Sequence, residues 1–295
     1  MKKIQGKVAV VTGAGSGIGR ATANALARKG AIIALADINE AGMKETARQI
    51  AAAGGHSSQH VVNVADRGQM EAFAKAVEAQ HGRVDIVVNN AGIGILDDFA
   101  DAPLEDFEKV VDINLWGVVY GSKLFLPALL KQGGGHIVNI SSLAGIISTP
   151  GMVSYGTTKF AVRGFSESLR TELAPLNVGV TSVHPGMIRT NIAKVSPCAD
   201  SALQQRMVEW FERWGRPPEL VANKIVHAIQ NNRMRVLVTP ETYVMDLFKR
   251  LTPSLAEQVN GLVMRSLRAW VNPDRQRVAG SQQGTSAAAA DRWAA

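Results

Sequence analysis

The sequence predicts an α/β fold built on a doubly wound parallel sheet. Short apolar runs rich in β-branched residues alternate along most of the chain with segments of helical spacing. This alternation is typical of strands that are buried on both faces and connected by helices. The first apolar run leads directly into a glycine-rich turn, and polar residues follow several later runs. In such sheets the carboxyl ends of the strands form the ligand site.

We expect strands at residues 7–12, 31–37, 59–63, 85–92, 136–140, 178–184 and 236–238. We expect helices at residues 20–30, 39–53, 67–81, 104–131, 152–174, 217–231, 243–251 and 254–270. Residues 1–250 then form one Rossmann-type domain, and residues 251–275 form a helical extension. Residues 276–295 have the composition of a disordered tail.

The composition is that of a globular chain. It has 295 residues, of which 46% are hydrophobic and 19% are charged. Its single cysteine, Cys198, excludes an internal disulfide and fits a reducing compartment, and no cluster of His, Cys and Asp indicates a metal site. The formal charge is +7, but no motif of aromatic and basic residues supports nucleic-acid binding.

Membrane and export signals are weak. No run approaches the ~18–20 apolar residues that span a bilayer. The opening M-K-K resembles the start of a signal peptide, but the apolar run from Val8 to Val11 is short and ends at T-G-A-G. We interpret this run as the first strand and expect a cytoplasmic protein.

The glycine-rich turn reads G-A-G-S-G-I-G over residues 13–19. The spacing is T-G-x-x-x-G-x-G rather than G-x-G-x-x-G, because Ile18 occupies the sixth position. A strand before the turn and a helix after it favour binding of a pyrophosphate at the helix N-terminus over a turn without a ligand. The residues expected to contact the cofactor are Gly13, Ser16, Gly17, Ile18 and Gly19.

Asp37 ends the second predicted strand, eighteen positions after Gly19. A carboxylate at this place accepts hydrogen bonds from the hydroxyls of the adenosine ribose and repels a 2′-phosphate. Asp37 therefore favours NAD over NADP as the cofactor. An alternative role, compatible with the first, is an N-cap for the helix that starts near Asn39.

Tyr155 and Lys159 lie four positions apart in a predicted helix, so their side chains share one face. A neighbouring cation lowers the pKa of a phenol from about 10, which makes a general acid/base near neutral pH. Ser142 precedes Tyr155 by thirteen positions and can hold a substrate oxygen beside the phenol. The spacing Y-x-x-x-K alone is a weak signal, because many helices contain it by chance.

Taken together, T-G-A-G-S-G-I-G, N-N-A-G, Asn114, Ser142 with Y-G-T-T-K, and P-G-M-I-R-T resemble the short-chain dehydrogenase/reductase family. The resemblance extends over about residues 5–240, and the motifs match in order and spacing. It implies an NAD(P)-binding catalytic domain that oxidises CH–OH groups or reduces the corresponding carbonyls. It also implies a catalytic tetrad of Asn114, Ser142, Tyr155 and Lys159.

The family pattern assigns a role to each residue. The tyrosine transfers the hydroxyl proton, the serine orients the substrate oxygen, the lysine binds the nicotinamide ribose, and the asparagine holds a water. The spacing to Tyr155 selects Ser142 over Ser141, and Asn63 stands where an aspartate is more usual. Besides Tyr155 and Lys159, the implied cofactor contacts are Asn63, Val64, Asn90, Pro185, Gly186, Ile188 and Thr190.

Two polar residues also fit ordinary structural roles. An asparagine inside a helix, such as Asn114, is more often solvated or locally capped than functional. His184 ends the strand at 178–184, and we expect it to support the following turn rather than to act as a catalyst.

The predicted substrate pocket is apolar. Residues 190–215 lack strong periodicity but contain Trp210, Phe211 and Trp214, which suits a mobile apolar lid. We therefore expect a hydrophobic secondary alcohol or ketone rather than a sugar. The expected pocket residues are Ile93, Ile95, Leu143, Ile147, Met152 and Met187.

The C-terminal extension departs from the compact family pattern. Its second helix carries apolar residues at helical spacing, with Arg265 and Arg268 beside them. It can pack on the domain or on a partner subunit, or it can lie on a membrane surface. The family pattern implies a homodimer or homotetramer, and the extension leaves that choice open.

The sequence is compatible with three functions. The first is an NAD-dependent alcohol dehydrogenase or ketone reductase with a lipophilic substrate. The second is an NADPH-dependent biosynthetic reductase of the 3-oxoacyl type, which a preference for NADPH would reveal. The third is a dinucleotide-sensing protein without turnover, which the presence of all four tetrad residues disfavours.

Overall fold

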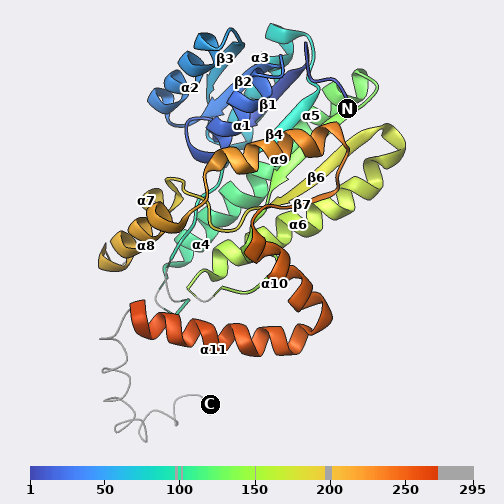
Figure 1. The fold of residues 1–295 in the computed structure, drawn as a ribbon. Helices are drawn as coiled ribbons and strands as arrows, with labels where there is room; N and C mark the ends of the chain where they lie inside the picture. The colour runs from blue at the N-terminus through green and yellow to red at the C-terminus, as the bar shows by residue number, and fades with distance from the viewer. Residues whose placement is uncertain (97–98, 101, 150, 197–200, 272–295) are drawn as a thin grey trace, which may run out of the picture.

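Seven parallel strands form one sheet in the order β3-β2-β1-β4-β5-β6-β7 (Figure 1). The computed structural model describes all residues except 97–98, 101, 150, 197–200 and 272–295. The chain builds one half of the sheet outward from β1 and then returns beside β1 to build the other half. The doubly wound parallel fold is therefore confirmed, whereas the predicted tail at 276–295 lies outside the described residues.

The strands are β1 Val8–Thr12, β2 Ile32–Asp37, β3 His56–Val61, β4 Ile86–Asn89, β5 Gly135–Ile140, β6 Val178–His184 and β7 Arg235–Leu237. The main helices that flank them are α1 Gly17–Ala27, α2 Glu40–Ala52, α3 Arg67–His81, α4 Leu104–Val111, α5 Gly117–Lys131, α6 Val153–Leu173 and α9 Pro218–Gln230.

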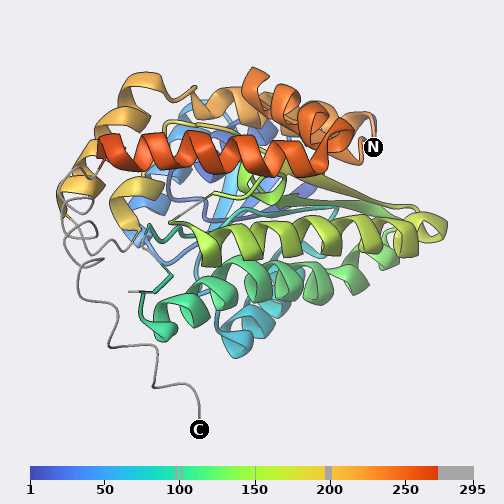
Figure 2. The same ribbon diagram turned by 90° about the horizontal axis from the view of Figure 1, so that it is seen from below.

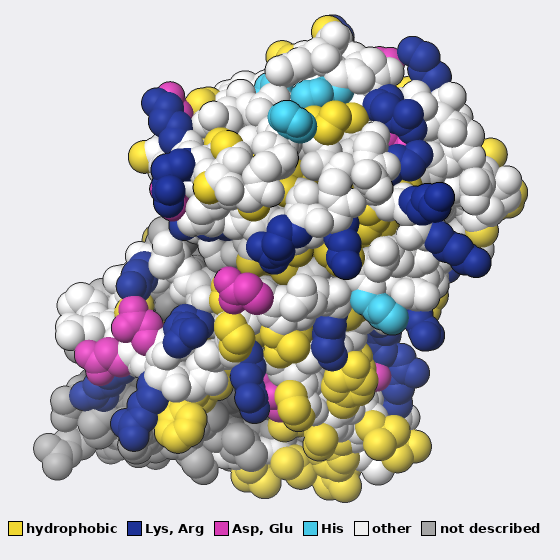
Figure 3. Space-filling view, turned by 45° about the horizontal axis from the view of Figure 1, so that its top comes forward, with side chains coloured by type: hydrophobic (Ala, Val, Ile, Leu, Met, Phe, Trp, Pro, Cys, Tyr) yellow, Lys and Arg dark blue, Asp and Glu magenta, His cyan; other side chains and the backbone are white. Residues whose placement is uncertain are grey.

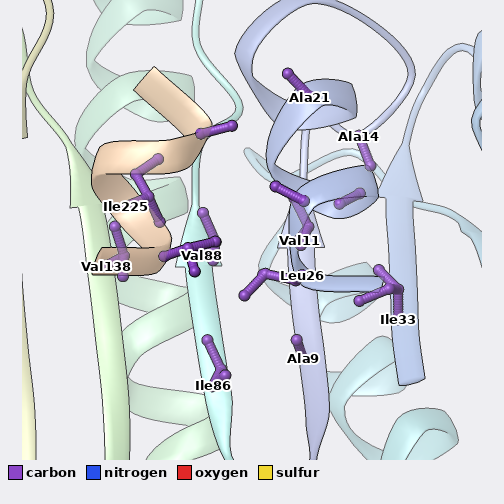
Figure 4. Close-up of a cluster of buried hydrophobic side chains, with 14 of the residues drawn as sticks. Ala9, Val11, Ala14, Ala21, Leu26, Ile33, Ile86, Val88, Val138 and Ile225 are labelled. Carbon is purple, nitrogen blue, oxygen red and sulfur yellow. The ribbon is translucent and has the colours of Figure 1, made fainter. Parts of the chain in front are cut away.

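Two helical layers cover the sheet, with α1, α2 and α9 on one face and α3, α5 and α6 on the other. Successive residues of a strand point to opposite faces, so each central strand supplies both cores. Val11 of β1 belongs to the core that includes Leu26 and Ile225 (Figure 4). Its neighbour Val10 belongs to the opposite core, with Phe73 and Phe125. This double burial explains why the central strands are continuous apolar runs.

The helix predicted at 104–131 contains a π-helical turn, Asp112–Trp116, between α4 and α5. Such turns insert one extra residue and often lie at functional sites. Among the described residues, only Leu104–Lys131 is long and apolar enough to cross a membrane by length and composition. Because α5 packs against β4, β5 and α3, this stretch is built as a core helix of the domain.

One predicted strand needs correction. β3 is His56–Val61 rather than 59–63, because it pairs with β2 from Ile32↔His56 to Asp37↔Val61. β3 is an edge strand, and its residues are mostly polar, so it does not form an apolar run in the sequence. The predicted lid at 190–215 is largely helical, with α7 Ile192–Val195 and α8 Ser201–Trp214.

The C-terminal part contains the two expected helices, α10 Pro240–Leu251 and α11 Pro253–Val271, with side chains described up to Leu262. A proline stands at the start of each helix, where the missing N–H group costs no intrahelical hydrogen bond. Arg235 of β7 and Asp246 of α10 form a largely buried ion pair. This pair fixes α10 to the edge of the sheet.

Candidate active site

The glycine-rich turn and the loop after β4 are joined by hydrogen bonds at the carboxyl end of the sheet. Nδ2 of Asn90 donates to the carbonyl oxygens of Thr12, at 2.9 Å, and Gly13, at 3.3 Å. The hydroxyl of Thr12 accepts from the N–H groups of Asn90 and Ala91. A Cβ atom on Gly19 would lie 2.0 Å from the Gly13 oxygen, so only glycine allows α1 to start here.

Asp37 holds the same turn from the other side. Its Oδ2 accepts from the Gly15 N–H at 2.7 Å, and its Oδ1 accepts from the Asn39 N–H at 2.8 Å. The N-cap of α2 is Asn39, whose side chain accepts from the Gly42 N–H. The alternative N-cap role for Asp37 is therefore wrong, and its carboxylate instead lies against the glycine-rich turn.

A cleft of about 440 Å³ opens at the N-terminus of α1. Its walls include Ser16 and Gly17 from the turn, Arg189 and Thr190 from the loop after β6, and Pro218 from α9. Exposed N–H groups at a helix N-terminus attract phosphate oxygens, and the glycines bring the backbone close to the ligand. The cleft, the turn and the adjacent Asp37 carboxylate fit a dinucleotide.

Tyr155 and Lys159 lie side by side on α6, as the spacing predicts. The Lys159 ammonium group is 5.5 Å from the centre of the Tyr155 ring and donates to the Ile140 carbonyl at 3.0 Å. Burial raises the pKa of Tyr155 above its ordinary value, although the nearby Ser142 hydroxyl opposes this shift. Burial also lowers the pKa of Lys159 to about 8.

The expected lowering of the Tyr155 pKa is therefore not found. The phenol is buried, and this desolvation disfavours the phenolate more than its neighbours stabilise it.

Asn114 is buried in the π-helical turn and holds the loop after β4. Its Oδ1 accepts from the Ile93 N–H at 2.9 Å, and its Nδ2 donates to the Ile93 carbonyl at 2.8 Å. A Cβ atom on Gly92 would lie 3.0 Å from Asn114 Oδ1 and 3.5 Å from Lys159 Nζ. Glycine at 92 thus lets the asparagine, the loop and the lysine come together, and the solvated alternative for Asn114 is wrong.

The hydroxyl groups of Ser141 and Ser142 have different hydrogen-bond partners. The Ser141 hydroxyl is buried and donates to the Lys159 carbonyl at 2.8 Å, so it serves the packing of α6 on β5. The Ser142 hydroxyl accepts from the Ala144 N–H and lies on the side of Tyr155. His184 Nδ1 is 3.1 Å from the Ser142 carbonyl oxygen, which agrees with a supporting role for this histidine.

The remaining predicted cofactor residues divide into two groups. The Leu143 N–H donates to the Pro185 carbonyl, Ile188 is buried, and Thr190 lies against Gly17, so the loop after β6 joins the turn. Asn63 instead accepts from the Ala65 N–H in a local turn, and Val64 packs towards Gly117. Among the described hydrogen bonds, none links the Asn63 side chain to the glycine-rich turn.

The predicted pocket residues lie on loops at the same end of the sheet. Ile95 and Ile147 are buried, whereas Leu143 and Met187 are partly exposed. Met152 Cε lies 3.9 Å from the position that a Cβ on Gly94 would take, so the loops after β4 and β5 meet there.

Sequence reasoning missed a contact made by the segment predicted to be a lid. The Ser196 hydroxyl, just after α7, accepts from the Gly94 N–H at 3.1 Å and donates to the Ile192 carbonyl at 2.6 Å. Thr158, which receives a hydrogen bond from Asn114, was missed as well. A serine outside any motif gives no signal for a contact that joins residues 102 positions apart.

A Rossmann-type sheet with a phosphate-binding turn and a buried Tyr–Lys pair defines a dinucleotide-dependent oxidoreductase. Comparison with known proteins supports this class. The family model for short chain dehydrogenases matches residues 7–199. This chain belongs to the short-chain dehydrogenase/reductase family and is an NAD(P)-dependent oxidoreductase that acts on CH–OH groups.

Several relatives are similar over most of their length. An oxidoreductase of Mycobacterium tuberculosis named SadH is 43% identical over 274 residues, 92% of this chain and 99% of the relative. The 3-oxoacyl-[acyl-carrier-protein] reductase FabG of Thermotoga maritima is 35% identical, over 74% of this chain and 88% of the relative. A Burkholderia phymatum short chain dehydrogenase/reductase in complex with NAD has a TM-score of 0.81 at 31% identity, covering 86% of this chain and 96% of that one.

Proposed function

We propose that this protein is an NAD-dependent alcohol dehydrogenase or ketone reductase for a hydrophobic secondary alcohol or its ketone. The observation that carries the proposal is the buried cluster of Tyr155, Lys159 and Asn114 with Ser142, next to the phosphate-binding turn. A proton-transferring group and a dinucleotide site at one sheet edge are what hydride exchange with a carbonyl compound requires.

Each side chain has a defined task in this mechanism. Ser142 orients the substrate oxygen, and Tyr155 takes up the hydroxyl proton during oxidation or returns it during reduction. Lys159 places a positive charge next to the Tyr155 ring, which stabilises the phenolate. The phenolate accepts the hydroxyl proton during oxidation, and it is left behind when the phenol donates its proton during reduction. Asn114 holds the loop around Ile93 through two hydrogen bonds, and Lys159 lies against this loop. A bound nicotinamide supplies the hydride acceptor or donor, which no side chain provides.

Asp37 supports NAD as the cofactor. It lies at the end of β2 and already accepts from the backbone of the turn that receives the pyrophosphate. Its negative charge disfavours a 2′-phosphate beside it. The NAD-bound structure of the Burkholderia relative supports the same preference.

The second candidate is an NADPH-dependent reductase of a 3-oxoacyl substrate. The similarity to FabG of Thermotoga maritima favours it. Both candidates use the same proton-transfer residues, so the cofactor preference separates them. A sensing protein without turnover stays the least favoured alternative, because the Tyr155–Lys159 pair is intact.

The deciding experiment is to compare NADH and NADPH binding by fluorescence and then to follow NAD reduction with a panel of apolar secondary alcohols. Preference for NADH with turnover on any of them supports the proposal. A strong preference for NADPH in the wild type that Asp37→Ala does not improve refutes it in favour of the second candidate. Tight NADH binding without turnover on the panel or on polar alcohols favours the sensing protein.

Partners and location are further proposals. We expect a cytoplasmic homodimer or homotetramer with weak contact to membrane surfaces through the C-terminal helix. Hydrophobic side chains gather near Lys and Arg at the lower right of Figure 3. Exposed apolar residues of α10 include Val244, Leu247 and Leu251. Sedimentation with anionic liposomes tests the contact, and a full chain that stays in the supernatant excludes it.

A further inference from the structure

His184, the last residue of β6, is completely buried and contacts the backbone of Ser142. Val180 of the same strand belongs to the core under α5 and α6. Because side chains alternate along a strand, Ser182 and His184 point to this face as well. Figure 2 shows α6, the helix of Tyr155, alongside α5 on this side of the sheet. The histidine therefore lies on the same face as the proton-transferring tyrosine.

The two ring nitrogens of His184 have different partners, and these partners fix the position of its proton. Nδ1 lies 3.1 Å from the Ser142 carbonyl oxygen, which can only accept a hydrogen bond, so Nδ1 carries the proton. Nε2 lies 3.0 Å from the Ser182 hydroxyl. Burial lowers the pKa of His184 to about 3, so the ring is neutral at pH 7 and Nε2 accepts from that hydroxyl. The Ser182 hydroxyl thus selects the tautomer that donates to Ser142.

The backbone around Ser142 is held from the end of β6 at three consecutive residues. The N–H groups of Ser141 and Leu143 donate to the backbone carbonyls on either side of His184, each at 2.8 Å. The Ser142 carbonyl, between them, accepts from the His184 side chain. Ser142 has extended backbone angles, and its hydroxyl accepts from the Ala144 N–H at 3.1 Å. A shift of the Ser142 peptide group would therefore move this hydroxyl from its place in the site.

We propose that His184 and Ser182 are positioning residues for Ser142. The Nδ1–H group of a neutral His184, held in that tautomer by the Ser182 hydroxyl, fixes the peptide that directs the Ser142 hydroxyl towards the substrate oxygen. This inference rests on the proposed function, in which Ser142 orients that oxygen. The two side chains leave 0% and 2% of their surface exposed, so they act on the substrate only through Ser142. A misplacement of about 1 Å in such a site costs about a hundredfold in rate.

The alternative is that His184 only fills the core at the end of β6. His136 provides the comparison, because it is a buried histidine of the same sheet whose Nε2 lies 2.7 Å from the Thr181 hydroxyl. Burial lowers the pKa of His136 to about 3 as well. It stands near the start of β5, at the end of the sheet opposite to the site. Loss of the His136 side chain should therefore lower stability without an effect on Ser142.

The test uses the full chain with His184→Leu, His184→Asn, Ser182→Ala and, as the matched control, His136→Leu. Leucine fills a similar volume without a donor, whereas the asparagine amide can take the place of Nδ1–H and keep the bond to Ser142. Nitrogen NMR shifts of the imidazole rings distinguish the two tautomers, and hydrogen exchange of the Ala144 amide reports its bond to the Ser142 hydroxyl. Activity is measured as kcat/KM with NAD and the alcohol of the panel that is oxidised fastest, and NADH affinity is measured by fluorescence.

We expect the wild-type spectrum to show His184 protonated at Nδ1. His184→Leu should speed exchange of the Ala144 amide and lower kcat/KM by about ten- to a hundredfold, while NADH affinity changes little. His184→Asn should retain most of the wild-type rate, and Ser182→Ala should fall between the two. His136→Leu should change neither the exchange at Ala144 nor kcat/KM.

A double-mutant cycle separates positioning from packing. In the Ser142→Ala background the hydroxyl is absent, so His184→Leu should lower kcat/KM no further. An equal loss in both backgrounds, a proton on Nε2, or unchanged exchange at Ala144 would overturn the inference. If His184→Leu does not fold, Ser182→Ala replaces it in the exchange measurement and in the cycle. If the wild type binds NADH but turns over no alcohol, the proposed function fails, and the tautomer and the exchange at Ala144 decide the inference alone.

Discussion

The Lys159 ammonium group donates a 3.0 Å hydrogen bond to the Ile140 carbonyl, the last residue of β5. This bond holds a buried cation, without a carboxylate partner among the described residues, at the point where the strand leads into Ser142. Such an arrangement costs folding free energy, because a charge is removed from water. This cost is consistent with a functional site, where residues needed for activity often lower the stability of the fold.

Tyr155→Phe removes the proton-transferring hydroxyl but keeps the ring. We expect turnover to fall by about a hundred- to ten-thousand-fold, the usual contribution of a positioned acid or base, while the Kd for NADH changes little. Steady-state kinetics and NADH fluorescence titration measure the two effects. Tyr120→Phe is the control, because Tyr120 stacks on Trp116 outside the site. Full turnover in Tyr155→Phe would exclude the assigned role.

Lys159→Met should stabilise the protein and abolish its activity. Burial lowers the pKa of Lys159 from 10.5 to about 8, so its charged form destabilises the folded state by on the order of 3 kcal/mol below pH 8. Loss of the bond to Ile140 offsets about 1 kcal/mol of the gain. The penalty fades as the pH rises from 8 towards 10.5, since the folded state then releases its proton first.

Urea denaturation at pH 7 and pH 9.5 measures this difference between Lys159→Met and the wild type. The gain in unfolding free energy should be larger at pH 7. Lys123→Met on α5 serves as the control for a lysine in a different environment. A variant that is less stable than the wild type at pH 7 would contradict this account of the buried ammonium group.

The sequence predicted the fold well because its strands are buried on both faces. Continuous apolar runs such as the one ending at Thr12 are typical of central strands in a parallel sheet, and the turn residues that follow them are chemically distinctive. The face shared by Tyr155 and Lys159 also followed from helical geometry alone. β3 was misplaced because an edge strand with polar side chains has little apolar signal.

The parts that the sequence did not predict depend on contacts between distant residues. The π-helical turn at Asp112–Trp116 places Asn114 against Ile93, and local helix propensity does not predict that contact. The pKa of Tyr155 is set by burial, which a neighbouring lysine in the sequence does not reveal. The contact between Ser148 and Glu257 joins a loop and a helix that share no motif.

Asp37 should control the choice of cofactor by charge. We expect Asp37→Asn to improve NADPH binding relative to NADH by about ten- to a hundredfold, equivalent to ~1.4–2.8 kcal/mol of removed repulsion. An asparagine still accepts from the Gly15 N–H, so the turn keeps its shape. Asp37→Ala lacks that acceptor and should weaken both cofactors. Fluorescence titration at two salt concentrations measures the ratio, and an unchanged ratio in Asp37→Asn would count against charge as the cause.

Ser196→Ala should loosen the lid without unfolding it. The Ser196 hydroxyl links the end of α7 to the Gly94 N–H beside Met152, so its loss removes the bond that fixes α7 to the loop after β4. A hydrogen bond of this kind contributes about 1 kcal/mol, so we expect KM for the substrate to rise about fivefold with little change in Tm. Ser196→Thr keeps the hydroxyl and should retain a KM near the wild-type value. Equal KM values in the wild type and Ser196→Ala would show that the lid does not depend on this bond.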